Sequence, residues 1–515
     1  MTYQDVVHAA RQYVEGTGSV EKTDEVFRSY MENPESYLKE RADLLEKELM
    51  ELYEKGEQRD YYFLSAMVQM VRSPRIHERL YRMLLSDESL SKETLYFVYC
   101  QMGRWEFVTR ELQLHEFFEL KDDLYEVIYQ KFKNELTKTY DWIPAKERDE
   151  KLVFVLSSQV LNLNHGPTKM LFDRAYVLRK SLGKEVMIFN TAELLSPIGE
   201  ISWFKATLGN YYDEFSKGKV VEFQDTKFPF FQFPQITPSI EMAEILLETI
   251  WKMKPWCVVT IGGNSILSDL CALEIPVLTL PTVYSGRAIC RSQFQMIGGS
   301  EKEHDNEWLG KHHLTNDHFV KEVFTFTFKP QSNTYTRKEL GLPEDGMITI
   351  ACSGRLNEEA DEQFMRFVKK LAENGIYTAF AGGFSKLAHY ADTDPLMKEY
   401  CIDLGYQTDM MGVYECCDVY LNPYRSGGGC SAAEALSKGL PALSMNYGDA
   451  GVSVGDDFHF ADYEAMVKEA VRLKEDPAYY HMKSEQAKVR AALLTDSARA
   501  FSSIMHAIEK RAAFQ

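Results

Sequence analysis

The stretch at residues 418–445 most constrains the fold of this 515-residue chain. Residues 418–422 form a short run of β-forming side chains, and Pro423 ends it. Three consecutive glycines come next, and residues 431–437 have helix-forming composition. Residues 441–445 form a second short strand. This order of strand, glycine turn, helix and strand predicts half of a doubly wound α/β domain.

The glycine turn has the composition of a phosphate-binding loop. Gly427, Gly428 and Gly429 place no side chains between the backbone and a ligand. Backbone amides can therefore approach an anion, and the N-terminus of the following helix favours negative charge. Glycine clusters are more often plain turns, so both interpretations stay open on this stretch alone.

A second copy of the pattern lies 165 residues earlier in the chain. Residues 257–280 align with the later stretch without gaps, so that Gly263 corresponds to Gly428 and Asp269 to Glu434. In each copy a carboxylate follows the glycine by six residues and precedes a proline by seven. Any two strand-helix-strand units look alike in outline, but the matched carboxylate and proline favour two similar α/β domains. We expect these domains to face each other across a cleft.

Composition limits what such a chain binds. The net charge of −19 argues against nucleic acid and against an anionic membrane surface, because both need clustered lysines and arginines. The nine cysteines show no zinc-like spacing, which fits a reduced cytosolic protein. No apolar run is long enough to span a bilayer, and the N-terminus lacks the apolar core of a signal peptide. We therefore expect a cytoplasmic protein with no nucleic-acid partner and no integral membrane segment.

The chain divides into three segments by its residue pattern. Residues 1–145 carry apolar side chains at helical spacing and predict an all-helical domain, which is either a plain packed bundle or a docking surface for a partner. Residues 146–330 open with a strand, a loop and a helix and predict a first Rossmann-like domain. Residues 331–515 predict a second one. We interpret the aromatic residues 203–235 as a wall of the cleft or an insertion packed on the core, and we expect a strand at residues 324–328.

The loop after the first strand of the second segment carries a histidine. Doubly wound sheets place their ligand sites at the carboxyl ends of strands. His165 lies in this loop and is a candidate general base, since an imidazole can exchange protons near neutral pH. The alternative is that His165 caps the following helix or bonds the backbone. A single histidine without a visible partner does not decide between the two.

Five short motifs occur in an order that resembles a known family. They are Gly354-Arg355-Leu356, Leu404-Gly405-Tyr406, residues 414–418, the glycine turn, and Glu434-Ala435-Leu436 with Gly439 and Pro441. Their order and spacing are similar to the C-terminal half of glycosyltransferases with the GT-B fold, and the resemblance covers about residues 152–495. The helical segment ahead of this pair resembles bacterial cytoplasmic protein glycosyltransferases and, more loosely, O-GlcNAc transferase, although no tetratricopeptide period is present.

The resemblance implies that the third segment binds a nucleotide sugar, expected to be a UDP-linked hexose or N-acetylhexosamine. It also implies that the second segment is the acceptor side.

The resemblance further assigns site residues in the third segment. The residues around the turn and the helix start are expected to face the diphosphate, namely Ser426, Gly427, Gly428, Gly429, Cys430 and Ser431. Arg355 is expected at the same phosphates, with Arg425 as a second candidate, because fixed cations stabilise a leaving diphosphate. The alternative for Arg355 is an ion pair between helix and strand. Glu434 is expected at the ribose hydroxyls, and Gly405 and Tyr406 at the base.

The sequence departs from the family pattern in two places. Many retaining members have a glutamate eight residues before the position of Glu434, where this chain has Ser426. The lysine expected after Gly-Arg-Leu is also missing, since residues 357–359 read Asn-Glu-Glu. We therefore expect inversion at the anomeric carbon, with His165 as the base, although a single loop carboxylate can fill the same role. We expect no metal and no further cofactor.

Two classes of function stay open at this point. The first is sugar transfer to a cytosolic protein side chain, with the acceptor docked on the helical segment. Transfer to a cell-surface polysaccharide or a lipid-linked precursor is its near neighbour. The second is a non-catalytic GT-B partner of an active transferase. The missing glutamate favours the second class, whereas the presence of Arg355, Glu434 and the glycine turn favours an enzyme.

Overall fold

The structure is a computed structural model that describes residues 2–32, 39–56, 60–109, 112, 117–163, 165–193, 203–204, 219–234, 238–283, 287–298, 306–311, 314–511 and 514–515. The chain forms two compact units. The first comprises Met1–Thr137, Glu193–Leu208 and Gln235–Ile240. The second comprises Lys138–Ala192, Gly209–Pro234 and Glu241–Gln515.

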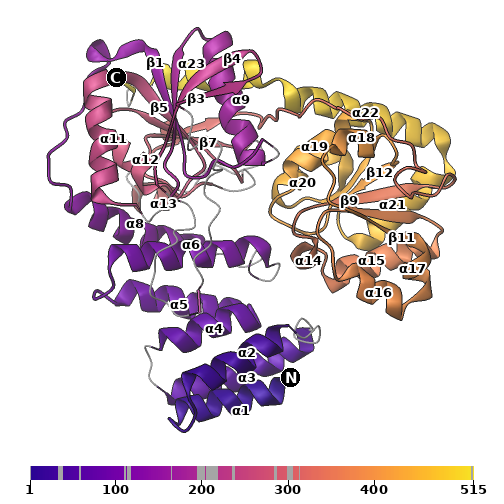
Figure 1. Cartoon of the computed structure of the whole chain (residues 1–515). Helices are drawn as coiled ribbons and strands as arrows, with labels where there is room; N and C mark the ends of the chain where they lie inside the picture. The colour runs from indigo at the N-terminus through magenta and orange to yellow at the C-terminus, as the bar shows by residue number, and fades with distance from the viewer. Residues whose placement is uncertain are drawn as a thin grey trace. The chain divides into compact units, whose positions relative to one another are not determined.

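The first unit is helical, as its residue pattern predicts (Figure 1). Its described helices are α1 (Tyr3–Val14), α2 (Val20–Met31), α3 (Lys39–Lys55), α4 (Tyr61–Val71), α5 (Pro74–Ser86), α6 (Lys92–Val108) and α8 (Phe118–Asn134). Thr2 and Asp5 form a capping box at the start of α1, and the Ser91 hydroxyl accepts a hydrogen bond from the Thr94 amide at α6. Pro74 stands at the first position of α5, where no backbone N–H is needed.

Aromatic side chains fill the core of this helical unit. Tyr81 is fully buried, and its hydroxyl donates to Glu106 at 2.6 Å. Trp203 belongs to the same unit and is also buried. The Arg28 guanidinium lies 4.5 Å from the centre of the Trp203 ring, and the side chain of Gln69 donates to the Trp203 carbonyl. Of the two interpretations of this aromatic stretch, Trp203 therefore fits the packed insertion.

The second unit contains two sheets. In the first, the strands lie in the order β3, β4, β2, β1, β5, β6, β7, β8. Their bounds are β1 (Asp149–Ser157), β2 (Glu185–Asn190), β3 (Val220–Phe223), β4 (Thr226–Gln232), β5 (Pro255–Ile261), β6 (Val277–Leu280), β7 (Phe294–Ile297) and β8 (Phe319–Lys321). Neighbours pair in parallel, except that β3 and β4 form an antiparallel hairpin at the edge. The accompanying helices are α9 (Gly166–Lys180), α11 (Ile240–Met253), α12 (Ile266–Leu270) and α13 (Asn306–Lys311).

The second sheet is entirely parallel, with the order β11, β10, β9, β12, β13, β14. Its strands are β9 (Ile348–Cys352), β10 (Tyr377–Ala381), β11 (Cys401–Gly405), β12 (Val419–Leu421), β13 (Ala442–Met445) and β14 (His459–Phe460). Counted from β9, this is the 3-2-1-4-5-6 order of doubly wound dinucleotide-binding sheets. Its helices are α14 (Leu356–Glu359), α15 (Glu362–Glu373), α16 (Leu387–Thr393), α17 (Pro395–Tyr400), α18 (Met410–Tyr414), α19 (Gly429–Ser437), α20 (Gly448–Val454), α21 (Tyr463–Glu475) and α22 (Pro477–Thr495).

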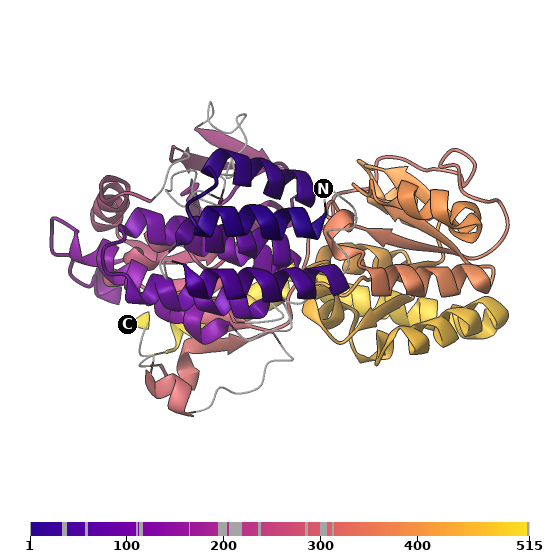
Figure 2. The same cartoon turned by 90° about the horizontal axis from the view of Figure 1, so that it is seen from below.

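The last helix, α23 (Ser497–Glu509), returns to the first sheet. Ala491 and Leu494 of α22 pack in the core of the second sheet, whereas Phe501 and Ile504 of α23 pack in the core of the first. Figures 1 and 2 show this yellow C-terminal segment running from the orange second sheet to the first. The third predicted segment therefore ends in a helix that packs with the second.

The predicted fold class, two Rossmann-like α/β sheets with a helical N-terminal part, is confirmed. Two local predictions are wrong. Residues 324–328 form no strand, because the Phe326 amide donates to the Leu494 carbonyl of α22 at 2.7 Å instead of to a neighbouring strand. The second concerns the aromatic residues 203–235, whose composition predicts irregular structure; residues 226–232 instead form β4 and pair with β2.

Candidate functional site

Each sheet has one point at which its strand order reverses. This point lies between β1 and β5 in the first sheet and between β9 and β12 in the second. Ligands of doubly wound sheets bind outside the carboxyl ends of the strands at such a point. The loop after β1 leads to His165, the loop after β9 to Arg355, and the loop after β12 to the glycine turn. Gly405 and Tyr406 lie farther out, at the end of the edge strand β11.

The glycine turn joins β12 to α19, which begins at Gly429, two residues earlier than the composition predicts. Gly428 precedes this helix with a φ of 94°, in the left-handed region that favours glycine. A Cβ atom on Gly428 would lie 2.6 Å from Nε of Arg425, so that guanidinium leaves no room for a side chain. Since the N-cap residue has no side chain, it cannot cap α19, and a ligand anion can take that role.

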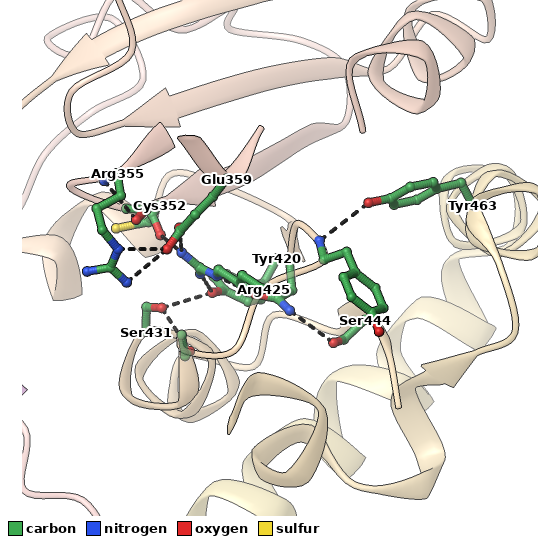
Figure 3. A network of polar contacts seen from close by, with 12 residues as sticks. Cys352, Arg355, Glu359, Tyr420, Arg425, Ser431, Ser444 and Tyr463 are labelled. Atoms are coloured by element: carbon green, nitrogen blue, oxygen red, sulfur yellow. Dashed lines mark hydrogen bonds and ion pairs between the residues drawn. The ribbon is translucent and has the colours of Figure 1, made fainter. Parts of the chain in front are cut away.

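Arg425 lies beneath the turn and is 2% exposed. Its guanidinium donates to Oε2 of Glu359 at 2.7 Å, Oδ1 of Asn422 at 2.8 Å, the Tyr420 hydroxyl at 2.9 Å and the Cys352 carbonyl at 3.1 Å (Figure 3). These bonds tie the carboxyl ends of β9 and β12 together under the turn. The structure thus gives Arg425 a positioning role. A direct contact with phosphate stays a prediction and requires some of these bonds to open.

Arg355 shares the same carboxylate from the other side (Figure 3). Its Nε and Nη2 lie 2.9 and 2.8 Å from Oε1 of Glu359, while Arg425 takes the second oxygen. Burial by itself raises the pKa of Glu359, but the guanidinium groups of Arg425 and Arg355 bring it below its ordinary value. The pair of Arg355 with Glu359 joins residues four apart along α14 and is not the helix-to-strand pair named as the alternative; the Arg355 side chain is 41% exposed, so its surface stays open to an anion.

Glu434 lies on α19, and its carboxylate contacts a lysine of α9, the helix that follows the first strand of the first sheet. Nζ of Lys169 lies 3.1 Å from Oε1 of Glu434 and 3.3 Å from Sγ of Cys430. Burial by itself lowers the pKa of Lys169, but Cys430 and Glu434 raise it above its ordinary value. Lys169 is not among the site residues that the sequence motifs predict. Its one signal is that it follows His165 by four residues and so shares a face of the same helix.

His165 is the N-cap residue of α9. Its Nδ1 lies 3.0 Å from the Thr168 hydroxyl, which also accepts a hydrogen bond from the Leu161 amide. Burial lowers the pKa of His165 to about 4, and the charges of Arg355 and Lys169 act in the same direction. The ring is therefore neutral at pH 7. The influence of Arg355 on this pKa also means that residues from the two switch points lie near one another.

Three more predicted residues complete the surroundings of the turn. The Ser431 hydroxyl lies 2.9 Å from the Tyr420 hydroxyl and donates to the Gly428 carbonyl at 3.0 Å. The Ser426 carbonyl accepts a hydrogen bond from the amide of Asp449 at 2.7 Å. Burial raises the pKa of the Cys430 thiol to about 12, so this cysteine is protonated at neutral pH.

Of the two residues predicted for the base, Gly405 is partly buried and Tyr406 is exposed. Gly405 has a φ of 60°, which again favours glycine, and its carbonyl accepts a hydrogen bond from the Gly382 amide. Tyr406 is 70% exposed. Among the described residues, no group of three or more His, Cys, Asp or Glu side chains is arranged to hold a metal ion. In the same part of the chain, no helix has both the length and the apolar character needed to cross a membrane.

Comparison with known proteins supports the fold. No family model and no curated protein matches the sequence. A mutant of the Thermobaculum terrenum O-GlcNAc transferase matches 98% of this chain and 95% of its own, at 11% identity and a TM-score of 0.51. A glycosyltransferase from Rickettsia africae matches 70% of this chain and 98% of its own, at 12% identity. Anabaena HepE in complex with UDP matches 70% of this chain and 100% of its own, at 10% identity. Both have a TM-score of 0.47. With its two sheets and its likeness to the Thermobaculum terrenum enzyme over 98% of its length, the chain has the GT-B fold of glycosyltransferases.

Proposed function

We propose that this chain is a glycosyltransferase that moves a sugar from a nucleotide-sugar donor to an acceptor. One observation carries the proposal: the second switch point combines an uncapped helix start, a half-exposed arginine and a buried carboxylate on that helix. These groups match the diphosphate and ribose of a nucleotide sugar. A non-catalytic partner that binds no nucleotide needs none of these groups.

The proposed chemistry follows from the charge that develops as the glycosidic bond breaks. The leaving nucleoside diphosphate gains negative charge, and fixed groups stabilise it without reorganising. The amides at the start of α19 and the guanidinium of Arg355 supply that stabilisation. The Glu434 carboxylate accepts hydrogen bonds from the ribose hydroxyls, and Gly405 and Tyr406 lie against the base.

For the donor and acceptor we propose a UDP-linked hexose or N-acetylhexosamine and a protein side chain. The name of the Thermobaculum terrenum neighbour, an O-GlcNAc transferase, supports the choice of an N-acetylhexosamine. The protein acceptor docks on the helical unit and the reaction takes place in the cytoplasm, in keeping with the net charge of −19 and the scattered cysteines. The proposed reaction uses no metal, because in this proposal Arg355 and the start of α19 stabilise the diphosphate.

The proposed transfer inverts the anomeric carbon, because Ser426 stands where many retaining members of this fold have a glutamate. Inversion requires a base for the acceptor hydroxyl, and we assign this role to His165. The ring accepts a proton at Nε2 when Nδ1 carries its hydrogen and donates it to the Thr168 hydroxyl. A pKa of about 4 makes His165 a weak base, but a bound diphosphate offsets the positive charges of Arg355 and Lys169 and so raises the pKa.

The proposal is tested by a thermal-shift screen of the full-length chain against nucleoside diphosphates and nucleotide sugars. A ligand at 100 times its dissociation constant stabilises the folded state by about 2.7 kcal/mol. We expect UDP and a UDP-sugar to raise the melting temperature, and the UDP-sugar to be slowly hydrolysed. A chain that no nucleotide stabilises contradicts the proposal, and one that binds but neither hydrolyses nor transfers supports the non-catalytic alternative.

His165→Ala tests the base. We expect turnover to fall about 100-fold or more, with donor affinity nearly unchanged, because the imidazole acts only on the acceptor proton. His389→Ala, at an exposed histidine on α16, is the matched control. Proton NMR of the product tests the stereochemistry separately. An α-linked product from an α-linked donor contradicts inversion. Full activity of His165→Ala shows that His165 is not the base.

A further inference from the structure

Helix α9 connects the donor site to the two segments that join the sheets. The Arg174 guanidinium is buried and donates to the Thr325 carbonyl at 3.0 Å and to its hydroxyl at 2.9 Å. The Ser497 hydroxyl donates to that Thr325 hydroxyl at 3.0 Å, and the Thr327 hydroxyl donates to Asp173. Thr325 lies between β8 and β9, and Ser497 begins α23. The middle of α9 is therefore fixed to both connections.

One turn before Asp173, the same helix presents Lys169 to α19. The Lys169 and Glu434 side chains are only 12% and 11% exposed. Nζ of Lys169 also lies 3.3 Å from Sγ of Cys430, which is the second residue of α19. The ammonium group is therefore positioned between the carboxylate proposed for the ribose and the helix start proposed for the diphosphate.

We propose that Lys169 is a diphosphate-recognition residue supplied by the first sheet's domain. When the donor binds, the ribose hydroxyls bind Glu434 and the ammonium group moves to the phosphates, where it neutralises the leaving group. The inference rests on the proposed function and deepens it.

The chemistry of the side chains favours Lys169 for this movement. A lysine is a point charge on a flexible four-carbon stem with three donors, so its ammonium group can serve two acceptors in turn. Arg425 is held by four partners beneath the turn and cannot move without breaking them. Since α9 is fixed to both connecting segments, the movement belongs to the side chain and not to the helix.

The experiment compares three ligands that differ only in phosphate, namely uridine, UMP and UDP. Their affinities are measured by calorimetry at one salt concentration for the full-length wild type, Lys169→Met and Lys169→Arg. Lys180→Met is the control, because Lys180 lies at the far end of α9 and pairs with the exposed Asp225. If another base gives the largest thermal shift, the series of that base is used.

We expect Lys169→Met to weaken UDP binding about 10- to 100-fold, UMP binding less, and uridine binding by under about twofold, since the lost contact is a charged hydrogen bond to phosphate. Lys169→Arg keeps the charge and should recover part of the UDP affinity. Equal losses for uridine and UDP overturn the inference, because Lys169 then acts only by holding Glu434. Unchanged UDP affinity in Lys169→Met also overturns it.

A second variant keeps the test valid if Lys169→Met folds poorly. Removing Lys169 leaves the Glu434 carboxylate without that cation, and Lys169→Met combined with Glu434→Gln removes the charge as well. Compared with Glu434→Gln alone, the double variant should still lose UDP affinity relative to uridine. If the ratio of UDP affinity to uridine affinity is the same in the double variant as in Glu434→Gln, the inference is contradicted. If the wild type binds none of the three ligands, the proposed function itself fails, which separates the two failures.

Discussion

The two glycine units match in sequence but differ in what surrounds each turn. Shifted by 165 residues, β13 falls on β6 residue for residue. In the earlier unit the Ser265 hydroxyl accepts a hydrogen bond from the Ser268 amide and caps α12. A Cβ atom on Gly263 would lie 2.8 Å from the Ile289 carbonyl. The chain's own backbone therefore packs against the earlier turn, and a serine caps the helix that follows it.

The later unit leaves the corresponding helix start open. Its N-cap residue is Gly428, and what packs against this glycine is the Arg425 guanidinium and not backbone. A repeated pattern of strand, glycine and helix thus produces the same order of elements twice, but α12 begins two residues later than α19 in the shared register. Only the copy whose helix start has no side-chain cap is equipped to bind an anion there.

The two sheets also bury carboxylates in opposite ways. Near the second sheet, Glu359 meets Arg355 and Arg425, and its pKa stays below the ordinary value despite burial. Near the first sheet, Glu274 is fully buried, and neither of its carboxylate oxygens has a hydrogen-bond partner among the described residues. Burial raises the pKa of Glu274 to about 8. One sheet therefore keeps a buried charge by pairing it, and the other keeps the group neutral.

The largest effect is expected from Arg425→Met. Removing one partner of a buried ion pair costs about 3–5 kcal/mol, because the remaining charge loses its compensation. Arg355→Met is the matched control on the same carboxylate, and its half-exposed side chain should cost much less stability while weakening donor binding. Urea unfolding measures the stabilities and calorimetry measures donor affinity. Equal losses of stability in the two variants would contradict the view that Arg425 supports the fold of the turn whereas Arg355 binds the donor.

Glu274→Gln tests the unpaired carboxyl. The folded protein holds a proton on Glu274 that the unfolded chain releases near its ordinary pKa of 4.5. Raising the pH from 4.5 to 8 therefore favours the unfolded state by about 1.4 kcal/mol per pH unit. The wild type should lose about 2–3 kcal/mol more than Glu274→Gln between pH 6 and pH 8. Thermal unfolding of both proteins at the two pH values checks this, and parallel pH dependences would contradict it.

Local patterns predicted much of the fold and part of the site. The strands expected at residues 418–422 and 441–445 are β12 and β13, because short β-rich runs between turns report local structure. His165 and Arg355 lie at switch points, as their positions after predicted strands indicate. The end of a strand can be predicted from local sequence, so the position of a residue that directly follows the strand can be predicted as well.

Contacts between distant segments were not predictable. Lys169 meets Glu434 across 265 residues, and no periodicity in either helix signals the partner. The same holds for Arg425, a loop residue whose direction depends on Glu359 of α14, and for α23, which packs in the core of the first sheet. Such contacts depend on how elements pack in three dimensions, which local propensity and spacing leave open.

Glu434→Ala and Asp269→Asn compare the matched carboxylates of the two units. We expect Glu434→Ala to weaken donor binding by about 1–3 kcal/mol, because a charged hydrogen bond to the ribose is lost. Asp269 is buried behind the earlier turn, so Asp269→Asn should leave donor affinity unchanged. Calorimetry with UDP measures both, with circular dichroism to check folding. Unchanged affinity in a folded Glu434 variant would count against the ribose assignment.

The smallest effect concerns the cap that distinguishes the earlier unit. Ser265→Ala removes the side-chain acceptor at the start of α12 and should lower the free energy of unfolding by about 1 kcal/mol. Ser265→Gly should lower it by only a few tenths of a kcal/mol, since glycine is tolerated at the N-cap. Neither variant should change UDP affinity, because the earlier turn is packed against the carbonyl of Ile289. A clear loss of UDP affinity in Ser265→Ala would show that the first sheet's turn also binds the nucleotide, and the contrast between a closed and an open copy would then fail.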